Sequence, residues 1–375
     1  MLEMRTSERK SLKTCPQQWY WSTVEGLRTP RSRTALWFGS AVHEALASWY
    51  IPGTKRGAHP AETFVRVLDG QRSVLVTNDE DEIEYVNSHE LGVDMLNRYV
   101  EHYGAEEWKE YISAEYVGNV TFARHKREMF GTTLSPRKQW LRYHFTADGV
   151  YRDLRTDELW LDEHKTAASI WSDLLPLDDQ AGSYWAIVPT ILRRKGLLRD
   201  DEEIAGITYN FLRKAMGDTR PFILHENGAK MYTNKPNKKE HYVNAISAAD
   251  RSVFTTLTGK ETLAQLQGIA ERLGIEVHGD ISASQPPPYF ERFPVYRSVG
   301  ERARMLERIR DEALFAEAYR NGDLPIVKSP GLNCRGCDFR RMCEMDEGGD
   351  QLSVEEFKET QYIVVDAYEA YREHV

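Results

Sequence analysis

The chain alternates between stretches with a hydrophobic residue at every second position and stretches with hydrophobic residues three or four positions apart. The first spacing predicts strands with one buried face, and the second predicts amphipathic helices. The expected strands are 111–117, 139–145, 159–165, 204–212 and 289–297. The expected helices are 36–50, 79–103, 178–195 and 298–321. Because a helix separates the third and fourth strands, this order predicts an α/β (α+β) protein with a central mixed β-sheet flanked by helices.

The strand expected at 159–165 begins with apolar residues and ends with charged ones. Its start, Leu159 to Leu161, has the continuous apolar character of a buried strand. Glu163 and Lys165 follow two positions apart, so their side chains project from the same face. The alternative is an exposed ion pair across two strands, but the buried run before the pair favours a functional site.

Asp148 follows the preceding expected strand, 139–145. A hairpin between this segment and the next strand would bring Asp148 beside Glu163. Two carboxylates and a lysine at the edge of a sheet are typical of hydrolases that use divalent metal ions. Glu115, on the first expected strand, fits a surface position better than a place in this site.

Two of the expected helices carry further candidates. His43 comes four residues after Gly39, so both lie on one face of helix 36–50, and Gly39 would let that helix pack closely against a neighbour. A histidine of this kind is by itself more typical of a partly buried structural residue. The interpretation of His43 as a functional residue therefore rests on its occurrence together with the two acids and the lysine. Gln180 and Tyr184 are also four residues apart and stack on one face of the following helix.

The residue types define the chemistry of such a site. Asp148 and Glu163 would bind one or two Mg²⁺ or Mn²⁺ ions, which prefer hard oxygen ligands. His43 could add a nitrogen ligand, which suits Mn²⁺ at least as well as Mg²⁺. Lys165 would sit beside a metal-bound water and orient it, or help to deprotonate it, for attack on a phosphodiester.

Composition restricts the class of protein. The chain has 375 residues, 41% of them hydrophobic, which is enough for a sizeable core. A net charge of −9 excludes a protein coated in basic surface, so nucleic acid would have to bind in a local basic cleft. No apolar run is long enough to span a bilayer and no secretory signal is visible, so we expect a cytoplasmic protein without a membrane partner.

The four cysteines are unevenly placed. Cys334, Cys337 and Cys343 form a tight trio, and Cys15 lies near the other end of the chain. A trio needs a fourth soft ligand, and Cys15 is the only cysteine left. Four thiolates suit either a [4Fe–4S] cluster or a structural Zn²⁺ ion, and the spacing alone does not separate the two.

Together, the motifs resemble the RecB-like branch of the PD-(D/E)xK nuclease superfamily, and they occur in that branch's order. The matching positions are Gly39, His43, Asp148, Glu163, Lys165, Gln180 and Tyr184. The resemblance implies a restriction-endonuclease-like core in which the histidine, aspartate and glutamate bind metal and the lysine is catalytic. It further implies that the Gln-x-x-x-Tyr helix shapes the site and contacts DNA. Ala147 stands where the motif name has proline, a change that is common in this branch.

The cysteine pattern carries a second resemblance. One distant cysteine followed by Pro16, together with a C-terminal trio, resembles the iron–sulfur staple of AddB-type and CRISPR-associated RecB-like exonucleases. This implies a [4Fe–4S] cluster that joins the N- and C-terminal segments across the nuclease core, with zinc as the alternative.

The expected domain organisation has four parts. Residues 1–220 form the nuclease core with the N-terminal cluster cysteine, and 221–288 form an insertion or accessory lobe. Residues 289–345 return to the core and carry the cluster trio, and 346–375 form a C-terminal helix.

The leading hypothesis is a metal-dependent DNA exonuclease that acts on single-stranded DNA or DNA ends in recombination, repair or replication. The chain has no GxxxxGK[ST] motif, so unwinding would require a helicase or recombination partner. Its compact size and single nuclease module suit a phage or other prokaryotic protein. The alternatives are a structure-specific endonuclease that trims DNA before integration and a non-catalytic subunit that binds DNA ends. The joint presence of Asp148, Glu163 and Lys165 argues against the last of these.

Overall fold

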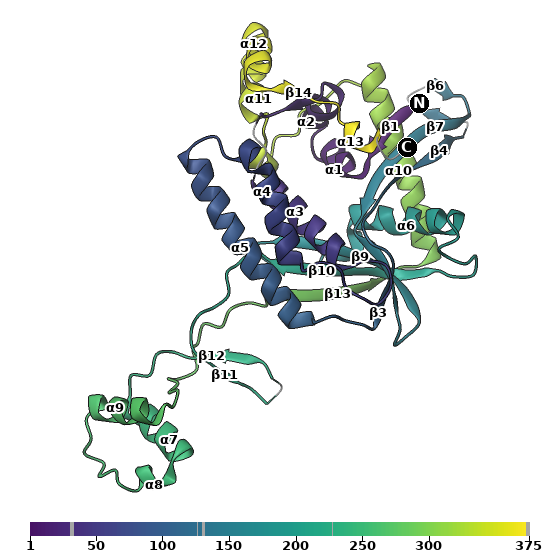
Figure 1. The fold of residues 1–375 in the computed structure, drawn as a ribbon. Helices are drawn as coiled ribbons and strands as arrows, with labels where there is room; N and C mark the ends of the chain where they lie inside the picture. The colour runs from purple at the N-terminus through teal and green to yellow at the C-terminus, as the bar shows by residue number, and fades with distance from the viewer. Residues whose placement is uncertain (31–33, 126, 130–131, 227, 373–375) are drawn as a thin grey trace. The chain divides into compact units, whose positions relative to one another are not determined.

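The computed structural model describes residues 1–30, 34–125, 127–129, 132–226 and 228–372. The chain divides into two compact units, one formed by Met1–Ala215 with Phe290–Val375 and the other by Met216–Tyr289 (Figure 1). The first unit holds every candidate site residue. Among the described helices, none is both long and apolar enough to cross a membrane.

A five-stranded sheet forms the centre of the first unit. Its strands, in spatial order, are β13 (Phe290–Tyr296), β10 (Ile204–Arg213), β9 (Glu158–Ala167), β8 (Gly149–Asp153) and β3 (Lys109–Ser113). Strands β9 and β10 are parallel, and every other neighbouring pair is antiparallel. The expected α/β fold with a central mixed sheet flanked by helices is confirmed, and it is consistent with a restriction-endonuclease-like core.

A second sheet of three strands continues from the first. Its order is β1 (Leu2–Arg5), β7 (Arg137–Ala147) and β4 (Tyr116–Arg124). The single strand expected at 111–117 is therefore wrong, because the chain leaves the central sheet after β3 and enters the second sheet as β4. The reason is pairing: β3 bonds to β8, whereas β4 bonds to β7.

Helices cover both faces of the central sheet (Figure 1). One face carries α3 (Thr34–Trp49), α4 (Pro60–Leu75) and α5 (Asp79–Tyr103), and the other carries α6 (Asp179–Arg194) and α10 (Val299–Asn321). Asn210 of β10 bonds to Tyr99 of α5, and the Trp185 indole of α6 donates to the Ile204 carbonyl. Because side chains alternate along a strand, β9 and β10 present different residues to the two helical layers.

Local sequence accounts for the long helix α5. The Asn78 side chain caps its N-terminus by accepting from the Asp81 N–H, and four acidic residues fill its first turn. Acidic side chains are favourable there because they face the positive end of the helix dipole. The helix ends at Gly104, whose φ of 64° favours glycine.

The two ends of the chain lie side by side (Figure 1). The N-terminal elements are α1 (Thr6–Thr14), α2 (Pro16–Trp19), the π-helical turn η1 (Tyr20–Val24) and β2 (Leu27–Arg28). The C-terminal elements are η3 (Leu332–Gly336), α11 (Arg340–Glu347), α12 (Gln351–Gln361), β14 (Ile363–Val364) and α13 (Glu369–Arg372). The single helix expected at 346–375 is wrong: α12 ends at Gln361, and the β-branched Ile363 and Val364 pair with β2 instead of continuing a helix.

The second unit contains a hairpin of β11 (Phe222–Leu224) and β12 (Lys230–Tyr232), and three helices, α7 (Lys239–Ala249), α8 (Arg251–Phe254) and α9 (Leu263–Leu273). It has a small core of its own, formed by Tyr242, Ile246, Leu266 and Ala270. Its bounds lie close to the insertion expected at 221–288, and its role as an accessory lobe stays a prediction. The remaining short elements are β5 (Arg127–Met129), β6 (Thr132–Leu134) and η2 (Leu175–Leu177).

Candidate active site and cysteine pocket

Asp148 lies between β7 and β8, where the chain passes from the three-stranded sheet into the five-stranded one. Gly149 pairs with Asp162 in the antiparallel ladder of β8 and β9, so Asp148 comes opposite Glu163 one step further along. Directly opposed residues on an antiparallel pair point to the same face. The two carboxylates expected to be neighbours are therefore brought to one end of the same ladder.

Both oxygens of Asp148 are engaged. Its Oδ1 lies 2.8 Å from Nδ1 of His43 on α3, and its Oδ2 accepts a hydrogen bond of 2.6 Å from the backbone N–H of His164. Burial alone would raise the pKa of Asp148, but the His43 imidazole and His164 lower it to about 2. Burial would likewise lower the pKa of His43, but the Asp148 carboxylate raises it to about 9. At neutral pH the metal-free pair is thus an aspartate with a histidinium.

Glu163 and Lys165 extend from the same face of β9. Lys165 Nζ donates to Glu163 Oε1 at 2.5 Å, while Glu163 Oε2 is buried and has no hydrogen-bond partner among the described residues. Burial and the Asp148 carboxylate raise the pKa of Glu163 to about 7, although Lys165 opposes this. Burial would lower the pKa of Lys165, but Glu163 and Asp178 raise it, so the amine is an ammonium at neutral pH.

Helix α6 brings Gln180 and Tyr184 to this face. The Gln180 side-chain amide donates to the Tyr184 hydroxyl at 3.1 Å, and the Tyr184 ring packs on Phe145 of β7. Tyr184 is buried, and burial together with the Glu163 carboxylate raises its pKa well above the ordinary value. Gln180 is exposed, so its amide lies where a substrate could reach it.

The structure adds Asp178 to the candidate site. Its Oδ2 lies 3.7 Å from Lys165 Nζ, and its Oδ1 caps α6 by accepting from the Gln180 N–H at 2.9 Å. An aspartate before a helix is a recognisable N-cap signal. The contact between Asp178 and Lys165 joins the start of α6 to the end of β9. The sequence did not predict it, because the two residues belong to different elements.

Glu115 is exposed, as expected, whereas Gly39 does not have its expected role. Glu115 lies between β3 and β4, and desolvation and the Asp148 carboxylate raise its pKa, so this surface acid lies within electrostatic reach of the site. A Cβ added at Gly39 would lie 3.7 Å from Thr166 Oγ1, which is an ordinary contact distance. Close helix packing therefore does not explain the glycine.

The arrangement of these side chains bears on metal binding. Across the described ranges, no group of three or more His, Cys, Asp and Glu residues is arranged to hold a metal ion. At this site, His43 pairs with Asp148 and Lys165 pairs with Glu163. The donor types nevertheless fit a hard divalent ion, and the unpartnered Oε2 of Glu163 is a buried acceptor that such an ion would satisfy.

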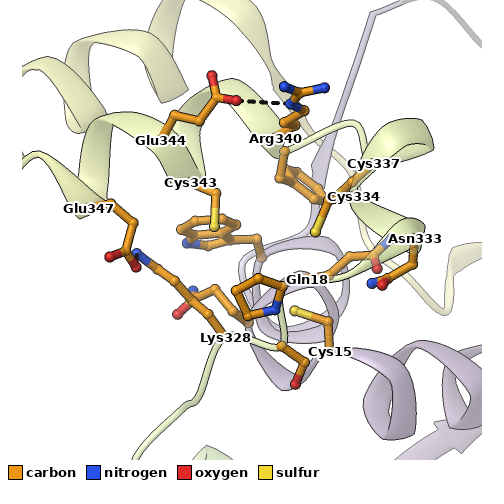
Figure 2. A pocket seen from close by; sticks show the side chains of 15 residues that line it. Cys15, Gln18, Lys328, Asn333, Cys334, Cys337, Arg340, Cys343, Glu344 and Glu347 are labelled. Carbon is orange, nitrogen blue, oxygen red and sulfur yellow. Dashed lines mark hydrogen bonds and ion pairs between the residues drawn. The ribbon is translucent and has the colours of Figure 1, made fainter.

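The four cysteines line one cavity of about 190 Å³. Figure 2 shows Cys15, from the N-terminal segment, facing the trio of Cys334, Cys337 and Cys343 from the C-terminal segment. All four are free thiols. Burial and the neighbouring cysteines raise the pKa of Cys337 and of Cys343.

Contacts around this cavity fasten the two ends of the chain together. The Gln17 N–H donates to the Val327 carbonyl at 3.1 Å, and Trp21 packs against Phe339 with ring centroids 5.7 Å apart. Cys15 stands in the break between α1 and α2, where its extended backbone interrupts the helix. The break directs this residue toward the pocket, where the trio lies.

Comparison with known proteins gives one family. Residues 6–133 match the family model described as PD-(D/E)XK nuclease superfamily. The matched segment includes Cys15 and His43 and ends before Asp148. No curated protein matches the chain. The chain is thus similar to the PD-(D/E)XK nuclease superfamily over this segment, and its mixed α/β core is consistent with that similarity.

Proposed function

We propose that this protein is a metal-dependent DNA exonuclease that hydrolyses phosphodiester bonds. The observation that carries the proposal is the convergence of Asp148, Glu163 and Lys165 at the junction of two sheets. The similarity of residues 6–133 to the PD-(D/E)XK nuclease superfamily supports a hydrolase that acts on DNA. We place the activity in recombination, repair or replication, with a helicase partner for unwinding because the chain has no GxxxxGK[ST] motif.

Mg²⁺ or Mn²⁺ would be held by Asp148 and Glu163, with His43 as a nitrogen ligand. A bound ion of this kind lowers the pKa of a coordinated water and neutralises charge on the phosphate. To become a ligand, His43 must give up the proton that it shares with Asp148 in the metal-free chain. Metal binding at this site is therefore coupled to proton release.

Lys165 is a cation, and this limits its role. An ammonium donates hydrogen bonds, so it can orient the attacking water or a phosphate oxygen, and it does not serve as the base. The water oxygen forms a bond to phosphorus and releases one proton to solvent, the bond from phosphorus to the leaving nucleotide oxygen breaks, and that oxygen takes up one proton from solvent, so the reaction consumes one water. Gln180, held by Tyr184 and exposed at the start of α6, would contact the DNA strand.

We further propose a [4Fe–4S] cluster in the cysteine pocket. Four thiolates could hold a single zinc ion, with each sulfur about 2.3 Å from the metal, or a four-iron cluster. A four-iron cluster gives each thiolate its own iron, so the thiolates lie further apart around a cavity. Four free cysteines lining one cavity from both ends of the chain support a shared metal centre, and we favour the cluster over zinc because the cysteine pattern resembles an iron–sulfur staple.

Cleavage of end-labelled DNA tests the nuclease activity. Linear single- and double-stranded DNA is incubated with Mg²⁺ or Mn²⁺ and the wild-type protein, Lys165→Ala, or the control Lys10→Ala, whose side chain is exposed on α1. We expect Lys165→Ala to lose at least about 100-fold in rate while the control keeps wild-type activity. Degradation that survives Lys165→Ala would overturn the proposed site. Cleavage of closed circular DNA would replace the exonuclease with the endonuclease that trims DNA before integration.

A further inference from the structure

A row of polar side chains crosses the central sheet on the face opposite Glu163 and Lys165. The row contains Arg292 of β13, Asn210 of β10 and His164 of β9. Asn210 pairs with Arg292 in the antiparallel ladder and with His164 in the parallel ladder. The three residues are therefore lateral neighbours on consecutive strands, and their side chains share one face.

Hydrogen bonds run along this row in one direction. Arg292 Nε donates to Asn210 Oδ1 at 3.1 Å, and the Asn210 amide nitrogen lies 2.9 Å from His164 Nδ1. Since Arg292 can only donate, the oxygen of the Asn210 amide must face it, and the NH₂ group must face His164. His164 Nδ1 is then an acceptor, which fixes the ring orientation and the tautomer with its proton on Nε2.

The far end of the row is rigidly held. Arg292 Nη2 donates to the Tyr99 hydroxyl at 2.9 Å, to the Tyr50 hydroxyl at 3.1 Å and to Glu106 Oε2 at 2.9 Å. The Asn210 amide also donates to Tyr99 at 2.7 Å. These groups are largely buried, and a buried polar group is costly unless it is hydrogen-bonded. A fully engaged network of this kind restricts each member to one position.

The near end of the row reaches the candidate active site. The His164 ring stacks on Tyr50, with centroids 5.7 Å apart and ring planes 20° apart. The backbone N–H of the same residue donates to Asp148 Oδ2 at 2.6 Å. Any rotation of β9 at His164 would therefore move the donor that orients the Asp148 carboxylate.

We propose that Arg292 and Asn210 are positioning residues, which act through His164 to hold the Asp148 carboxylate in the orientation that binds the metal ion. This inference rests on the proposed metal-dependent function of Asp148. Groups that orient a metal ligand from behind are typically worth 10- to 100-fold in metal affinity. Neither residue touches the metal or the DNA in this scheme.

Direct Mn²⁺ binding to the full-length protein tests the proposal. Free Mn²⁺ is measured by electron paramagnetic resonance during a titration, without DNA, while thermal unfolding reports on the fold. The variants are Asn210→Leu, which removes the amide at similar volume, and Thr208→Val. Thr208 lies on the same strand and face, is also buried, and bonds to the Tyr151 hydroxyl at 2.9 Å, so it is a matched control outside the row.

We expect Asn210→Leu to weaken Mn²⁺ binding about 10-fold. Thr208→Val should bind Mn²⁺ within about twofold of wild type, because it leaves the row intact. The positioning role is overturned if folded Asn210→Leu binds Mn²⁺ as tightly as wild type, or if Thr208→Val weakens binding equally. Asp148→Asn separates the two proposals: wild-type Mn²⁺ binding by this variant would overturn the metal site itself and the positioning role with it.

A second variant covers the case in which Asn210→Leu does not fold. Arg292→Lys keeps a cation beside Glu106 but cannot reproduce the planar set of donors that reaches both Glu106 and Asn210. We expect Arg292→Lys to weaken Mn²⁺ binding at least threefold, which is a smaller loss of affinity than that expected for Asn210→Leu. Wild-type Mn²⁺ affinity in Arg292→Lys would also overturn the positioning role.

Discussion

His43 and Asp148 form one hydrogen bond, 2.8 Å between Nδ1 and Oδ1, that joins helix α3 to the junction of the two sheets. The bond pairs a histidinium with an aspartate in the metal-free chain. The same two side chains are the candidate ligands of a divalent ion. The shared proton thus holds the two side chains of the candidate site together.

Replacing His43 by alanine should destabilise the metal-free protein. The buried Asp148 carboxylate would lose its charged partner, which we expect to lower the free energy of unfolding by about 2 kcal/mol at pH 7. Because the pKa of His43 is raised from 6.5 to about 9, the contribution is complete below pH 6.5 and is lost as the pH rises through 9. Urea unfolding at pH 6 and pH 10 measures the difference, and exposed His125→Ala is the control. An equal loss at both pH values would contradict the ion pair.

Tyr184→Phe should weaken DNA binding while the fold stays intact. The variant keeps the ring that packs on Phe145 and removes only the hydroxyl that accepts from Gln180. Loss of one such bond corresponds to about a fivefold rise in KM for DNA, since Gln180 loses its fixed orientation. Steady-state cleavage and thermal unfolding measure the two properties. A lower melting temperature with an unchanged KM would assign Tyr184 a structural role only.

Removing one cysteine should abolish the cluster. Anaerobically purified wild type should be brown and contain iron, whereas Cys15→Ser should be colourless and melt at a lower temperature, because the two chain ends lose a covalent link through the metal. Ser329 lines the same pocket but carries no thiol, so the control variant Ser329→Ala should keep the brown colour. A colourless wild-type protein that contains zinc would show that the pocket holds a single metal ion.

Glu8→Gln should stabilise the protein above neutral pH. Glu8 is buried beside the Tyr368 hydroxyl, and burial raises its pKa from 4.5 to about 7. Its folded state therefore binds the proton more tightly than the unfolded state, and stability falls as the pH rises from about 4.5 to about 7. At pH 8 the variant should gain up to about 3 kcal/mol, and near pH 5 the gain should fall to about 1 kcal/mol or less. Urea midpoints at the two pH values check this, and a gain independent of pH would contradict it.

Gly92→Ala should destabilise the contact between α4 and α5. A Cβ at Gly92 would lie 2.1 Å from Phe64 Cζ, so the buried ring would have to move. Overpacking of this kind costs about 1–3 kcal/mol. Gly70→Ala on α4 is the matched control, because no atom lies within 4 Å of its Cβ and alanine is the better helix former. Thermal unfolding should show a loss for Gly92→Ala and no loss for Gly70→Ala.

The sequence by itself determined the mixed α/β core and the face of β9 that carries Glu163 and Lys165. A strand has a period of two, so residues two apart share a face wherever the strand is placed. Helical spacing likewise put Gln180 beside Tyr184, since this contact lies within one helix. These relationships are local and depend only on backbone geometry.

Only the tertiary structure decided the relationships between distant segments. Asp148 stands at the junction of two sheets because β3 and β4 pair with different strands, and no local pattern marks that division. The meeting of Cys15 with its trio, and the alignment of Arg292, Asn210 and His164, depend on strand register and on the return of the chain ends. Register follows from the sum of many side-chain contacts across the whole core, and a single segment of sequence does not contain that sum.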